Sequence, residues 1–116
     1  MLSKESVQNL SSLGSLAQTF QELGEQLKDP MVQKRFAGNA FLLMGWHRLT
    51  IDGLAKASGC SQSTMSRLLS GRGKFDRTNP LIFASIALTL GVNANTLLFV
   101  DLREKFSEFL KKLETT

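Results

Sequence analysis

The fold is decided by residues 49–72, which read LTIDGLAKASGCSQSTMSRLLSGR. Thr50 is placed to cap a short helix over 51–58, and Ser61 is placed to cap a second helix over 62–69. Gly59 stands between them, at a position where a positive φ costs little only for glycine. The stretch therefore predicts two short helices joined by a tight turn.

The side chains of this stretch divide into an inner and an outer set. Ala55 is small enough to let the two helices approach closely, and Leu54, Met65 and Leu68 fall on inward positions. The outward positions of the second helix carry hydrogen-bonding side chains and no acid: Gln62, Ser63, Thr64, Ser66 and Arg67. We therefore expect the second helix to present a polar face without negative charge.

More helices are expected on either side of this pair. Asp29-Pro30 and Asn79-Pro80 each place a capping residue before a proline at the first helical position. No stretch alternates apolar and polar residues as a strand would, so the sequence predicts an all-α protein. The further expected elements are helices over 30–47, 80–90 and 93–99, a polar loop over 70–78 and a tail helix from residue 101.

The motif resembles the helix-turn-helix of the lambda-repressor and Cro-like family, and the resemblance spans residue 30 to about residue 99. The family signature falls on these residues: Leu54, Ala55, Gly59 and Met65, the turn Ser70, Gly71 and Arg72, and the later Ala87, Leu90, Gly91 and Val92. Five residues depart from it. Gly53 lies within the first helix, where glycine costs about 1 kcal/mol relative to alanine. Ile51 stands where many members carry a phosphate-contacting Gln, and Ser58 stands where an aliphatic residue is usual. Met44 and Leu69 stand where some members bury an Arg–Glu pair.

The resemblance implies that the second helix enters the major groove of duplex DNA. The residues then expected to read bases are Gln62, Ser63, Ser66 and Arg67, and those expected to contact phosphates are Lys56, Thr64, Arg72, Lys74 and Arg77. The alternative is that Arg67, Lys74 and Arg77 are ordinary solvated surface residues.

The charge of the chain is concentrated where the motif lies. The chain has 116 residues and a net charge of +4. Residues 30–78 contain eight bases and two acids, whereas residues 1–29 contain two bases and four acids, and residues 79–116 four of each. Such a distribution indicates a face that binds a polyanion, or else one that the bases merely keep soluble.

Several function classes have little support. The chain has one cysteine, Cys60, and one histidine, His47, so it lacks the residues for an internal disulfide or a structural zinc site. It shows no nucleophile–base pair and no phosphate-loop spacing, so an enzyme is not expected, and neither is a cofactor or a metal. The apolar stretch 81–90 is too short to span a membrane. We therefore expect a cytoplasmic protein.

Both ends of the chain carry apolar stripes at helical spacing. The sequence suggests an N-terminal arm over 1–29, whose early serines and glycine favour a late helix start, a DNA-binding domain over 30–99 and a C-terminal helix over 100–116. The stripes predict a homodimer through these residues: Leu13, Leu16, Phe20, Leu23 and Leu27, and Leu102, Phe106, Phe109 and Leu113. The alternative is that the end helices pack on Phe41, Leu42 and Trp46 of their own chain.

The function expected from this reading is sequence-specific regulation of transcription. A dimer on an inverted-repeat operator would repress a small phage, plasmid or mobile-element operon, which can include its own gene. The alternative is a DNA-binding antitoxin that masks a protein toxin through a terminal helix.

Overall fold

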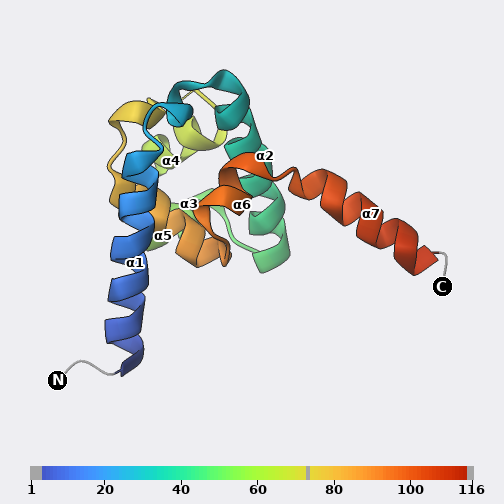
Figure 1. Ribbon diagram of the computed structural model, residues 1–116, viewed down its shortest axis with the longest axis horizontal. Coiled ribbons are helices and arrows are strands. Elements are labelled where there is room, and N and C mark those ends of the chain that lie inside the picture. The colour runs from blue at the N-terminus through green and yellow to red at the C-terminus, as the bar shows by residue number, and fades with distance from the viewer. Residues whose placement is uncertain (1–3, 73, 115–116) are drawn as a thin grey trace.

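The computed structural model describes residues 4–72 and 74–114, and every regular element within them is helical (Figure 1). The elements in chain order are α1 (Lys4–Glu22), the 3₁₀ helix η1 (Gln26–Lys28), α2 (Pro30–His47), α3 (Ile51–Ser58), α4 (Gln62–Leu69), the 3₁₀ helix η2 (Phe75–Arg77), α5 (Pro80–Leu90), α6 (Ala94–Phe99) and α7 (Leu102–Glu114). The all-α prediction is confirmed, as are the bounds predicted for α2, α3, α4 and α5.

The helices begin where polar side chains cap them. The Asp29 carboxylate accepts a hydrogen bond from the backbone N–H of Met31 at 2.9 Å, and the Asn79 side chain accepts one from Leu81 at 3.0 Å. Each satisfies one of the N–H groups that the first turn of a helix leaves without a partner. Thr50 caps α3 in the same way, through the N–H of Gly53 at 3.0 Å.

The core is built around α5, which lies between α1 and α3. The Phe83 ring of α5 is fully buried and stacks on Phe20 of α1, with ring centroids 5.4 Å apart. Phe36 of α2 meets Phe83 edge-on at 5.6 Å and Phe75 of η2 edge-on at 5.3 Å. Because buried aromatic rings contribute large apolar areas, this four-ring cluster ties α1, α2, α5 and η2 into one core.

The N-terminal stripe belongs to this core, which corrects two expectations. Phe20 is 1% exposed and Leu27 is 3% exposed, so neither is available to a dimer partner as predicted. They do not share a helix either, because α1 ends at Glu22 and Leu27 lies on η1. The helix also begins at Lys4, earlier than predicted. Leu13 and Leu16, which lie beside these serines and this glycine, pack against the core, and this packing offsets the weak helix propensity of their neighbours.

The C-terminal helix is placed differently, because α7 extends away from the other helices (Figure 1). Its first half contacts α2, where the Phe106 ring lies 5.7 Å from the Trp46 ring. Further along, Phe109 is 58% exposed and Leu110 is 56% exposed. The end of α7 therefore presents an apolar surface to solvent. None of the described helices is both long and apolar enough to cross a membrane.

A single buried side chain fixes the start of α7. The Nδ2 group of Asn39 on α2 donates to the carbonyl oxygens of Leu97 at 2.8 Å and Val100 at 2.7 Å, with that of Thr96 at 3.2 Å. Its Oδ1 accepts from the N–H of Leu102 at 3.3 Å. Asn39 is 3% exposed, so these bonds form out of water, where an amide left without partners would be costly. Asn39 thus joins α2 to both the end of α6 and the start of α7.

Candidate nucleic-acid interface

The two short helices α3 and α4 meet as the sequence predicted. Leu54, Met65 and Leu68 are buried between them and the core, and Ala55 is 1% exposed. Gly59 ends α3 with a φ of 71°, and its N–H bonds to the carbonyl of Lys56 at 3.3 Å. The predicted need for glycine at this turn is therefore confirmed.

The first turn of α4 is held by two hydrogen bonds between Ser61 and Thr64. Ser61 Oγ accepts from the backbone N–H of Thr64 at 3.1 Å and donates to Thr64 Oγ1 at 2.9 Å. Because the Thr64 hydroxyl accepts a hydrogen bond from Ser61, its own O–H remains available to donate to another acceptor. The prediction that Thr64 contacts a phosphate is compatible with this geometry.

The four residues predicted to read bases are all exposed on α4. They are Gln62, Ser63, Ser66 and Arg67. Thr64 is half-buried, and the inward positions are filled by Met65, Leu68 and Leu69. One side of α4 is therefore in the core, and the other is free for a ligand.

A basic hollow of about 530 Å³ adjoins this exposed face. Its lining comes from three consecutive parts of the chain: Thr64, Arg67 and Leu68 of α4, Arg72 and Lys74 of the following loop, and Arg77 and Thr78 at η2. Four of these residues are bases, and none of the described residues that line the hollow is acidic. The hollow therefore concentrates positive potential beside α4, as a phosphate-binding surface requires.

The loop that carries these bases is anchored to the core. Phe75 is 1% exposed and packs against Phe36 and Phe83. The Thr78 hydroxyl donates to the carbonyl of Lys74 at 2.8 Å. Residues 70–78 were predicted as a polar loop, and this prediction missed η2. The only signal for it in the sequence is Phe75, a large apolar residue among polar neighbours.

Lys56, also predicted to contact phosphate, lies apart from the hollow. Its Nζ lies 3.0 Å from a carboxylate oxygen of Asp52, one turn earlier on α3. Both side chains are well exposed, and such surface pairs contribute at most about 1 kcal/mol. The pair is weak enough to be exchanged for a phosphate, so the prediction for Lys56 stands but gains no support.

The single cysteine and the single histidine both lie next to helix ends, away from the basic hollow. His47 Nε2 lies 2.9 Å from the carbonyl oxygen of Leu90 and so links the end of α2 to the end of α5. Cys60 is half-buried at the turn before α4, and this burial raises the pKa of its thiol. Neither residue lines the basic hollow.

Three of the residues that depart from the pattern of the resemblance are buried. Met44 and Leu69 are 4% and 2% exposed, so both positions that would hold the charge pair are filled by buried apolar side chains. Ser58 is 5% exposed, and its hydroxyl has no hydrogen-bond partner among the described residues. A buried hydroxyl without a partner lowers stability, so this position is a weak point of α3.

Comparisons with protein-family models, with curated proteins and with solved structures found no match. The family resemblance therefore depends on the residues and spacings of this chain alone.

Proposed function

We propose that this protein is a sequence-specific, double-stranded DNA-binding regulator of transcription, with α3 and α4 as a lambda-repressor-like helix-turn-helix. The observation that carries the proposal is that a hydrogen-bonding surface and a basic surface lie side by side. The exposed face of α4 offers hydrogen-bonding side chains, and the adjacent hollow contains four bases and no acid among its described lining residues. DNA requires both, because base edges specify the sequence and phosphates supply most of the affinity.

The roles of the side chains follow from groove geometry. With the first turn of α4 leading into the major groove, Gln62 would pair with an adenine edge and Arg67 with a guanine edge. Ser63 and Ser66 would contact base edges or the backbone. Meanwhile, the bases of the loop and η2 would meet the phosphates that flank the groove, which sets the register of α4.

A single α4 of eight residues contacts only a few base pairs, so useful specificity favours two copies on an inverted repeat. The surface that supports a homodimer is the outer part of α7, with Phe109 and Leu110 exposed. Leu102 and Phe106 are half-buried against the body, and Leu113 is 56% exposed. On the N-terminal stripe, Leu13, Leu16 and Leu23 are half-buried against the core, which leaves α7 as the better candidate.

The family resemblance adds that such a dimer would repress a small phage, plasmid or mobile-element operon by covering its promoter. The second candidate function is an antitoxin. It is favoured by the way in which α7 projects from the body, because a projecting amphipathic helix can insert into a groove on another protein (Figure 1).

Selection of bound sequences from random duplex DNA tests the proposal. We expect enrichment of an inverted repeat with half-sites about one helical turn, or 34 Å, apart. Failure to enrich any sequence would refute sequence-specific binding. Enrichment of one unpaired half-site would refute the dimer and favour the antitoxin, whose α7 awaits a different protein.

A further inference from the structure

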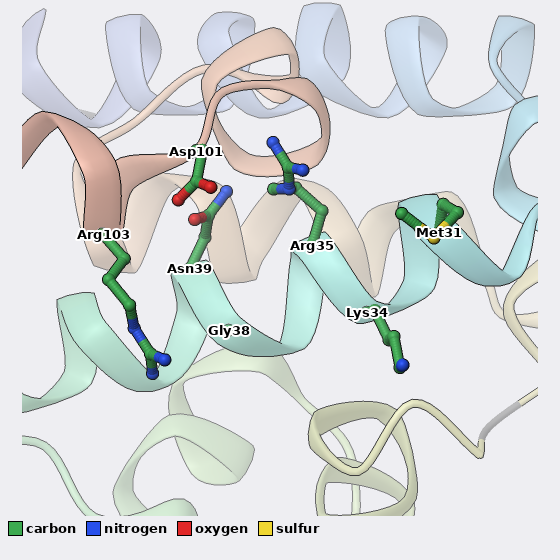
Figure 2. Close-up of a pocket in the computed structure, with 7 residues that line it drawn as sticks. All are labelled: Met31, Lys34, Arg35, Gly38, Asn39, Asp101 and Arg103. Atoms are coloured by element: carbon green, nitrogen blue, oxygen red, sulfur yellow. The ribbon is translucent and has the colours of Figure 1, made fainter.

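We propose that a second site, between α2 and the α6–α7 junction, binds a small amphipathic anion with a phosphate or carboxylate head and a short hydrocarbon body. A hollow of about 300 Å³ lies here, separate from the hollow beside α4 (Figure 2). Its lining comes from segments more than sixty residues apart: Met31, Lys34, Arg35, Gly38 and Asn39 of α2, and Asp101 and Arg103 at the start of α7. No role in the proposed DNA contact uses these residues.

The charge of this hollow is positive and only partly compensated. Three of its residues are bases and one is an acid. The acid, Asp101, is occupied at the first turn of α7, where its carboxylate accepts from the N–H of Glu104 at 3.1 Å. Among the described residues, no carboxylate lies within 4.0 Å of the charged groups of Lys34, Arg35 or Arg103. An anion would supply the missing counter-charge.

The floor of the hollow is open for a head group. Gly38 lies on α2 between Lys34 and Arg103, which extend on one side of the helix in Figure 2. A Cβ added at Gly38 would meet no atom within 4 Å, so the chain itself does not fill this space. Asn39 is not a ligand, because all of its amide atoms are already bonded to the α6–α7 junction.

An apolar hollow of about 150 Å³ continues from the first. It is lined by Met31, Val32, Arg35, Leu98 and Phe99, so Met31 and Arg35 border both hollows. Met31 is 64% exposed and Phe99 is 40% exposed. Arg35 extends on the other side of α2 from Lys34 and Arg103 in Figure 2. We therefore assign Lys34 and Arg103, which flank Gly38, to the head group, Arg35 to the border that the two hollows share, and the apolar hollow to the hydrocarbon body. Mostly apolar walls with a few placed polar groups are typical of small-molecule sites.

Occupancy would tie α2 to the first turn of α7, because the bases come from both helices. A bound anion would thus restrict movement of α7 about its junction. The binding itself does not depend on the DNA-binding proposal, and the titration that tests it contains no DNA.

The test is a calorimetric and NMR titration of the full chain with n-octyl phosphate. We expect saturable one-to-one binding with amide shifts at Gly38 and Arg103, at least tenfold tighter than for inorganic phosphate or 1-octanol. The double variant Arg35→Gln/Arg103→Gln should weaken binding at least tenfold. Gly38→Leu should weaken it as well, with a helical spectrum like that of the wild type, since the added side chain points into open space. The matched control Lys28→Gln/Lys105→Gln removes the same charge elsewhere and should bind as the wild type does.

Two results would overturn the inference. One is the absence of saturable binding, or binding that survives in Arg35→Gln/Arg103→Gln. The other comes from measuring DNA affinity of that variant across salt concentrations: a slope about one or two units shallower would assign these arginines to DNA phosphates instead.

Discussion

Three bases of the hollow beside α4, Arg72, Lys74 and Arg77, make a quantitative prediction about salt, because they are the ones assigned to phosphates. Each phosphate that a protein neutralises contributes about −0.9 to the slope of log affinity against log salt. If each of the three neutralises one phosphate, the hollow accounts for a slope of about −2.7. Raising the salt from about 50 to 200 mM would then lower affinity about 40-fold through these contacts alone.

The perturbation is the double variant Lys74→Gln/Arg77→Gln, which keeps Phe75 and its anchoring contacts. We expect the contribution of the hollow to fall to about −0.9, which Arg72 alone supplies, so the same salt step lowers affinity only about 3.5-fold through it. Affinity should fall equally for operator and unrelated DNA, because phosphate contacts carry no sequence information.

Fluorescence anisotropy across a salt series measures the slope, and unfolding temperature checks that the fold is intact. Lys105→Gln/Lys112→Gln on α7 removes the same charge away from the hollow, and its slope should match the wild type. An unchanged slope in Lys74→Gln/Arg77→Gln, or an equal change in the α7 control, would refute the assignment of the hollow to phosphates.

Four further predictions concern single residues. Arg67→Ala should weaken operator binding by about 1–3 kcal/mol and relax the preference at one base pair, and a competition assay on single-base operator variants would contradict this if all sequences lost affinity alike. Gly59→Val should lower the free energy of unfolding by about 1–3 kcal/mol, because a β-branched residue resists the φ of 71°, whereas Gly59→Asn should lower it less. If Gly59→Val melted at the same temperature as the wild type, the backbone at residue 59 would not be strained by a side chain. Ser58→Ala should raise the free energy of unfolding by about 1 kcal/mol, or the melting temperature by about 4 °C, because it removes a buried hydroxyl without a partner among the described residues. A lower melting temperature would show that the hydroxyl forms a hydrogen bond. Phe109→Asp should dissociate the dimer in sedimentation at micromolar concentration with helix content preserved, and a dimer that persists would place the interface elsewhere.

The sequence is a good guide to the helices because their ends have local causes. Asp29-Pro30 and Asn79-Pro80 begin helices through side-chain caps, and Gly59 ends one through a backbone conformation that other residues resist. Each signal acts within a few residues, so it can be read without knowing the fold.

The errors come from contacts between distant segments. Nothing near Phe20 or Leu27 reveals that α5 and η2 will cover them, so their apolar character equally suits a core or a dimer surface. The bases beside α4 could be named from charge and from the family resemblance. The hollow itself could not, since it depends on Phe75 turning η2 back onto Phe36.

The junction that Asn39 holds sets the direction in which α7 leaves the other helices. α7 has 13 residues, which at about 1.5 Å each gives an arm of about 20 Å. A rotation of about 10° at its base would move the tip by about 3.5 Å, close to the rise of about 3.4 Å per base pair along a DNA strand. If two copies join through α7, the hydrogen bonds of Asn39 set the separation of the two α4 helices. That separation determines the operator spacing that both helices can contact. Asn39, which has no proposed contact with DNA, would then determine which base pairs the two α4 helices contact.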